Sequence, residues 1–179
     1  MRRLIVLISI GFLIAACGGK QTLTSAASYQ LYDEVKALVE QGADVNEADG
    51  DGFTPLLSAA RVGNLPIAKY LIDKGAEVNH QSEDGWTALL WASYYNNYPL
   101  AKLLILRGAD PDKQNNEGWT ALMYAANYGH ENIARLLVEN KATLNMTNQA
   151  GYTALYYAEQ AQREELAQYL LAHGAKPLY

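Results

Sequence analysis

The sequence predicts an all-α solenoid, a row of stacked two-helix units of equal length. A segment that opens with glycine, an aromatic residue and threonine recurs four times at intervals of 33 residues. A second segment, Gly-Ala-Asp-Val-Asn in its first copy, recurs in phase with the first. A fixed period between about 20 and 50 residues is typical of stacked arrays, because each unit buries its apolar face only against its neighbours. The copies occupy residues 52–60, 85–93, 118–126 and 151–158 for the first segment, and 42–46, 75–79, 108–112 and, altered, 141–145 for the second.

The first complete unit shows why these residue types favour two short helices. Thr54 can cap a helix, because its hydroxyl can accept a hydrogen bond from a free backbone N–H of the first turn. Pro55 then occupies the first helical position, where its missing N–H costs nothing. Gly75 follows the second helix, where the backbone turns left-handed and glycine has no Cβ to clash. The buried stripes are Leu56, Ala59 and Ala60 on the first helix, and Ile67, Ala68, Leu71 and Ile72 on the second.

Later copies depart from this pattern at their turns. Asn96 and Gln162 stand between helices where the first unit has Gly63. Lys141 stands where glycine should follow the second helix of the third unit. A left-handed lysine costs on the order of 1 kcal/mol relative to glycine, so we expect local strain at this turn.

The two recurring motifs together resemble the ankyrin repeat, over residues 22–179. The resemblance implies helix-turn-helix units connected by β-turn fingers that project from the stack. It divides the chain into a cap at about residues 22–48, repeats at about 49–81, 82–114 and 115–147, and a closing repeat at 148–179.

The chain departs from the family at the histidine of its Thr-Pro-Leu-His motif. The histidine network that links neighbouring repeats is therefore absent, and polar registration between repeats is in question. We expect apolar and aromatic packing to replace it. The residues at this position are Leu57, Leu90, Met123 and Tyr156.

Residues 1–16 predict a secretory signal, since two arginines precede a short apolar run. As a helix the run would reach about 20 Å, short of the ~30 Å hydrocarbon core of a bilayer. Residues 13–17, Leu-Ile-Ala-Ala-Cys, resemble the bacterial lipobox, which implies cleavage before Cys17 and acylation of its thiol and new amine. The alternative is a plain signal peptide with an incidental cysteine, which would leave a reactive free thiol.

This resemblance implies a lipid-anchored protein of the cell envelope, with residues 17–21 as a short tether. Gly18 stands where aspartate would retain such a lipoprotein at the inner membrane, so we expect the periplasmic face of the outer membrane. Loss of the two arginines of residues 1–16 lowers the net charge from −5 to −7. This acidity argues against nucleic acid and against binding of anionic lipid headgroups.

No catalytic or metal-binding set assembles along the sequence. His80, His130 and His173 occupy different positions of the repeat, and the resemblance gives His130 a structural role in the turn between helices. Catalysis needs a positioned base near a nucleophile or an oxyanion site, and structural zinc needs clustered thiols or histidines. The acidic run at residues 44–51 lacks the bidentate glutamate of a calcium loop. We therefore expect no enzyme activity, no metal, no cofactor and no small-molecule substrate.

Aromatic residues follow the glycine of each finger, at a place that points into the concave face of the resembled fold. We expect their rings to form a ladder spaced roughly 10 Å apart, with three tyrosines late on first helices beside it. Exposed rings in a groove would anchor a partner; alternatively, they pack against neighbouring fingers. The ladder and its neighbours are Phe53, Trp86, Trp119 and Tyr152, with Tyr94, Tyr95 and Tyr128; a second column, Ser58, Trp91, Tyr124 and Tyr157, is assigned to the core.

The sequence thus predicts a non-catalytic module, anchored to the bacterial envelope through Cys17, that binds a protein partner on its aromatic concave face. The alternative is a module that binds glycan or peptidoglycan by stacking sugar rings on the tryptophan and tyrosine ladder.

Overall fold

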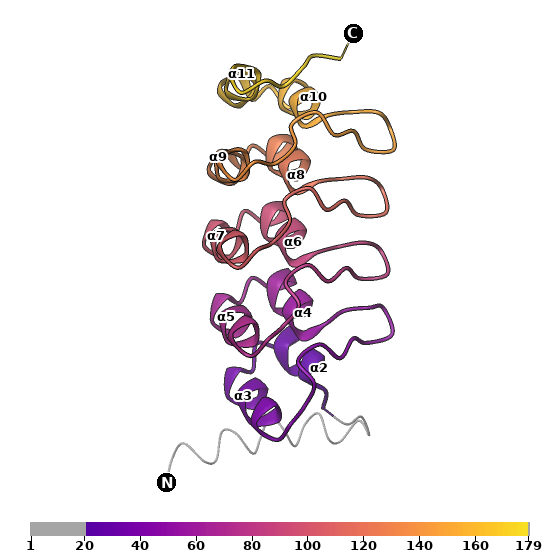
Figure 1. Ribbon diagram of the computed structural model, residues 1–179, viewed down its shortest axis with the longest axis vertical. Coiled ribbons are helices and arrows are strands. Elements are labelled where there is room, and N and C mark those ends of the chain that lie inside the picture. Colours follow the sequence, from indigo (N-terminus) through magenta and orange to yellow (C-terminus); the bar gives the residue numbers. More distant parts are fainter. Residues whose placement is uncertain (1–20, 179) are drawn as a thin grey trace.

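A computed structural model describes residues 21–178, and the fold over these residues is the predicted all-α solenoid. Five antiparallel helix pairs stack in one direction, with the first helix of each pair in an inner column and the second in an outer column (Figure 1). The inner helices are α2 (Leu23–Ser28), α4 (Pro55–Arg61), α6 (Ala88–Tyr94), α8 (Ala121–Tyr128) and α10 (Ala154–Gln160). The outer helices are α3 (Tyr32–Glu40), α5 (Leu65–Asp73), α7 (Tyr98–Leu106), α9 (Glu131–Glu139) and α11 (Glu164–Ala172).

The predicted signal peptide, Cys17 and the tether up to residue 20 lie outside the described residues. Across residues 21–178, every helix is too short or too polar to cross a bilayer.

A threonine begins each inner helix, as the sequence predicts for Thr54. Its hydroxyl accepts a hydrogen bond from the backbone N–H three residues on, 3.3 Å away at Leu57, which satisfies one of the free donors of the first turn. The same bond recurs at Thr87, Thr120 and Thr153. Because the inner helices are short and carry alanine on their buried faces, neighbouring repeats approach closely.

The outer helices bury one side against the inner column. In α5, Ile67, Ala68 and Leu71 are fully buried, and Asn64 caps the helix by accepting from the Ile67 N–H at 3.0 Å. In α11 the buried residues are Leu166, Ala167 and Leu170, at the positions that are also buried in α5 and α7.

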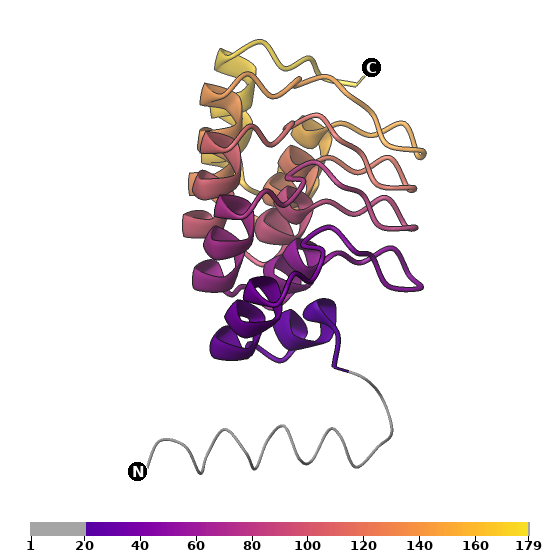
Figure 2. The same ribbon diagram turned by 60° about the horizontal axis from the view of Figure 1, so that its bottom comes forward.

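Four fingers, residues 43–53, 76–86, 109–119 and 142–152, project from the inner column and lie side by side (Figure 2). Their backbones touch: the Glu83 N–H donates to the Asp51 carbonyl at 3.1 Å, and the Asn116 N–H donates to the Asp84 carbonyl at 3.0 Å. A Cβ on Gly85 would lie 2.8 Å from the Asn116 nitrogen, so glycine is required for this approach as well as for the φ of +78°.

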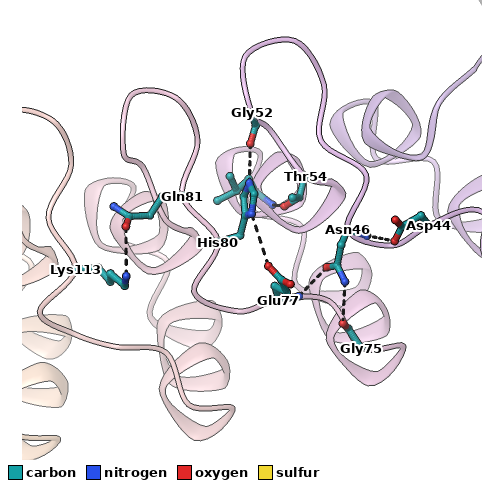
Figure 3. A network of polar contacts seen from close by, with 10 residues as sticks. Asp44, Asn46, Gly52, Thr54, Gly75, Glu77, His80, Gln81 and Lys113 are labelled. Carbon is teal, nitrogen blue, oxygen red and sulfur yellow. Dashed lines mark hydrogen bonds and ion pairs between the residues drawn. The ribbon is translucent and has the colours of Figure 1, made fainter.

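Polar registration between repeats is present after all, and side-chain amides of the fingers supply it. The Asn46 amide nitrogen donates to the Gly75 carbonyl at 3.3 Å, and its oxygen accepts from the Glu77 N–H at 2.8 Å (Figure 3). Asn79 and Asn145 make the same pair of bonds one and three repeats later. From the sequence, polar links between repeats were considered at the histidine position alone. The asparagine that supplies them was not predicted, although asparagine recurs at this position with the repeat period.

The turns adopt the left-handed geometry that the sequence predicts. Lys141 has a φ of 66°, while Gly75 and Gly108, at equivalent positions, have φ values of 94° and 84°. Asn96 and Gln162 both have a φ of 56°. The stacking of repeats therefore fixes a left-handed backbone at these turns. Residues other than glycine adopt this conformation with strain.

We expect Lys141→Gly to stabilise the array by about 1 kcal/mol, because glycine relieves the left-handed strain. Urea denaturation measures the change in the free energy of unfolding. Lys74→Gly is the matched control: Lys74 ends α5 with a φ of −96°, so glycine there brings no relief and should destabilise. A lower stability of Lys141→Gly than of the unmodified protein would contradict this assignment of the turn.

Candidate binding face

Six aromatic rings form one continuous stack along the inner column, and we call this set the aromatic stack. Its members come from two fingers and from the inner helices of three successive repeats. In order along the solenoid they are Tyr95, Trp91, Trp86, Tyr124, Trp119 and Tyr157.

Each finger tryptophan lies between two helix rings. Trp86 stacks on Trp91 of its own repeat at 3.9 Å and on Tyr124 of the next repeat at 5.1 Å. Trp119 stacks on Tyr124 at 4.8 Å and on Tyr157 of the closing repeat at 4.4 Å. Interplanar angles in these pairs are 18° to 29°. Stacked pairs add about 0.5–1.5 kcal/mol beyond the burial of their area, so the stack links repeats through the fingers.

In the third and fourth fingers, an asparagine side chain joins the finger to a tyrosine of an inner helix. The Asn115 side-chain oxygen accepts from the Trp119 backbone N–H at 2.9 Å, and its amide nitrogen donates to the Tyr124 hydroxyl at 2.9 Å. Asn148 repeats both bonds with Tyr152 and Tyr157. One buried amide therefore joins the backbone of a finger aromatic residue to the hydroxyl of a helix tyrosine, and these asparagines were not among the predicted site residues.

Tyr94 supports the stack from the side. Its ring meets Trp86, Tyr95, Tyr124 and Tyr128 edge to face, at centroid distances of 4.9 to 5.8 Å. Edge-to-face geometry places the positive edge of one ring against the negative face of another, which is a favoured arrangement.

The predicted site residues divide into covered and open rings. Phe53, Trp86, Tyr94 and Trp119 are half-buried, whereas Tyr95, Tyr128 and Tyr152 are 54%, 43% and 37% exposed. A helix ring is inserted between neighbouring finger rings of the predicted ladder: Tyr124 lies between Trp86 and Trp119. Tyr152 ends the row by stacking on Tyr156 at 4.0 Å.

The second column is only partly core. Ser58 and Tyr124 are buried as the sequence predicts, but Trp91 and Tyr157 are half-buried and belong to the stack. Helical spacing alone does not distinguish these half-buried rings from core residues. The same side of the inner helix faces both the neighbouring repeat and the fingers.

Burial raises the pKa of two tyrosine hydroxyls on this face. It raises the pKa of Tyr124 to about 12, against the opposing effect of the Asn115 hydrogen bond. Burial, followed by hydrogen bonding with Tyr94, also raises the pKa of Tyr128. These rings therefore add no charge to the face at neutral pH.

A cavity of about 430 Å³ opens between the first and second fingers, beside the stack. Its lining combines three rings, three carboxylates and one guanidinium: Phe53, Trp86, Trp91, Asp51, Glu83, Asp84 and Arg61. The Arg61 guanidinium carbon lies 4.8 Å from the centre of the Phe53 ring, within the range of a cation–π contact.

Two histidines, His130 and His80, contact backbone carbonyls of a preceding repeat. His130 lies in the turn between α8 and α9, with Nδ1 at 2.9 Å from the Ser93 carbonyl oxygen, and its ring stacks on Tyr128. His80 places Nε2 at 3.1 Å from the Gly52 carbonyl oxygen (Figure 3). Within residues 21–178, no three side chains of the metal-binding types gather at one point.

The family model for ankyrin repeats matches residues 23–115 and 89–178, and so covers almost all of the described residues. The chain belongs to the ankyrin-repeat family. Ankyrin repeats generally mediate protein–protein interactions and are typically non-catalytic. The search of curated proteins finds no match for this chain.

Proposed function

We propose that this chain is a protein-binding module of the bacterial envelope, which holds its partner on the face formed by the fingers and the inner helices. The observation that carries the proposal is the open end of the aromatic stack. Tyr95 lies at that end and is 54% exposed. Its ring stacks on Trp91 with 5.8 Å between the centroids, and it meets the Tyr94 ring edge to face. A half-exposed ring that neighbours already hold loses little side-chain entropy when a partner covers it.

Tyr128 extends this open surface by one repeat. It is 43% exposed, and Tyr94 and His130 contact its ring. Supported aromatic rings of this kind are the residues that most often carry the free energy of a protein interface.

A protein partner suits this face better than a sugar. Stacking on a sugar needs a free ring face, but Trp86 and Trp119 each lie between two other rings. These two tryptophans of the ladder therefore have no free ring face for a sugar.

The envelope location rests on the amino-terminal sequence. We propose that the signal is cleaved before Cys17 and that this cysteine carries the lipid anchor, since two or more acyl chains hold a protein stably at a membrane. Mass spectrometry of the mature amino terminus tests this: the expected product begins at Cys17 with added lipid mass, and Cys17→Ser releases the protein from membranes. An unlipidated mature terminus would remove the anchor.

We expect Tyr95→Ala combined with Tyr128→Ala to weaken partner binding by at least about 10-fold, since interface aromatics commonly contribute 1–2 kcal/mol or more each. A photo-reactive phenylalanine analogue at position 95 should first capture the partner in native envelopes, and titration of the identified protein then measures the affinity.

Tyr98 supplies the matched control. It is a tyrosine of 36% exposure that begins the outer helix α7 and makes none of the ring contacts of the aromatic stack. Tyr98→Ala should leave binding unchanged, and the analogue at position 98 should not capture the same protein. An equal loss of partner affinity in Tyr98→Ala and in the Tyr95/Tyr128 double variant would place the binding face elsewhere. Capture of the partner from position 98 alone would do the same.

A further inference from the structure

Negative charge is concentrated on the fingers. They hold ten of the nineteen carboxylates of the chain, while Lys113 is their one lysine or arginine. The helices and turns therefore come close to charge balance, and the fingers account for the acidity of the molecule. The finger carboxylates are Asp44, Glu47, Asp49, Asp51, Glu77, Glu83, Asp84, Asp110, Asp112 and Glu117.

Three of these carboxylates meet at the cavity between the first and second fingers. Asp51, Glu83 and Asp84 line it and are all exposed. The ion pairs formed within residues 21–178 use none of the three. Other finger acids serve the fold: Asp44 and Asp110 accept hydrogen bonds from backbone N–H groups of their own turns.

The nearest cation does not neutralise this group. Arg61 lines the same cavity, but its guanidinium lies over the Phe53 ring and forms no ion pair with the three acids. Three carboxylates against one guanidinium leave a net negative cavity. A concave wall of low dielectric concentrates such a field and attracts positive charge.

The apolar part of the cavity fits the stem of a long basic side chain. Phe53, Trp86 and Trp91 supply aromatic surface, and the carboxylates belong to the fingers above the inner helices. Lysine and arginine bury a methylene stem against apolar surface while their charged head reaches polar partners. Charge-assisted hydrogen bonds from that head to carboxylates are roughly twice as strong as neutral ones.

We propose that this cavity binds a single cationic side chain, an arginine or lysine, of the protein partner. The inference rests on the proposed function, because it names the chemistry that the partner presents to the same face. Trp91 connects the cavity to the proposed binding face, since it lines the cavity and stacks on Tyr95. The partner's basic residue occupies the cavity while an apolar surface next to it covers Tyr95.

The test uses blocked tripeptides in place of the partner: acetyl-Gly-Arg-Gly-amide, its lysine equivalent, and a glutamine version as the neutral control. The chain has three tryptophans, and NMR resolves one indole N–H signal for each. Trp86 and Trp91 line the cavity, and Trp119 lies one repeat away as an internal control. We expect the cationic peptides to shift the first two signals saturably, with a dissociation constant on the order of millimolar, and to leave Trp119 unchanged.

Matched charge variants locate the effect. Asp84→Asn should weaken peptide binding several-fold, whereas Glu117→Gln, the same position one repeat later and the same change in net charge, should not. Arg61→Gln should strengthen it, because a competing cation is removed. Comparison of the arginine and lysine peptides shows which head group the cavity favours.

Equal shifts with the glutamine peptide, or equal losses from Asp84→Asn and Glu117→Gln, would overturn the cavity proposal. If that happened while Tyr95 and Tyr128 still governed partner capture, the binding face would stand without the cation site. If the peptides bound but the tyrosine substitutions left partner capture intact, the cavity would stand and the proposed face would fail.

Discussion

Ring-on-ring contact between a finger of one repeat and an inner helix of the next is the interaction on which the rest of this structure depends. A two-helix unit of this length cannot bury its apolar face alone, so its stability is shared with its neighbours. Over most of the interface between repeats, alanines and leucines bury the apolar faces. At the fingers, Trp86 and Trp119 reach across the boundary between repeats and hold the projecting loops against the column.

Under the proposed function, this surface separates structural from recognition roles. The covered tryptophans stack between helix rings, while Tyr95 at one end of the stack and Tyr128 beside it are exposed. Because these two tyrosines rest on rings that are already fixed, binding of the proposed partner need not order them. The finger backbones, joined by hydrogen bonds from each finger to the next, carry the carboxylates at fixed positions relative to these rings.

The sequence predicted the fold well because its information is periodic and local. The threonine caps, the left-handed turns at Asn96 and Lys141 and the helix order follow from residue type and spacing alone. The accessibility of the rings did not follow. Trp91 and Tyr157 share the helical spacing of core residues, and whether each ring is covered depends on its partners in the stack: Trp86 and Tyr95 for Trp91, and Trp119 of the preceding repeat for Tyr157.

The cavity was harder still to foresee. Asp51 and Asp84 occupy the same position in successive repeats, and this periodicity alone does not bring them together. Their meeting with Glu83 and Arg61 depends on how far two fingers stand apart, and packing between repeats decides that distance. The polar ladder of Asn46, Asn79 and Asn145 was visible as a periodic residue, but its partners lie in the following repeat.

A double-mutant cycle between Trp86 and Tyr124 tests most directly whether the aromatic stack couples the repeats. Trp86→Leu, Tyr124→Leu and the double variant are each unfolded in urea, and the coupling is the part of the stability loss that is not additive. The stack predicts a favourable coupling of about 0.5–1.5 kcal/mol between these two rings. Additive losses, with no coupling between residues from different repeats, would contradict the account.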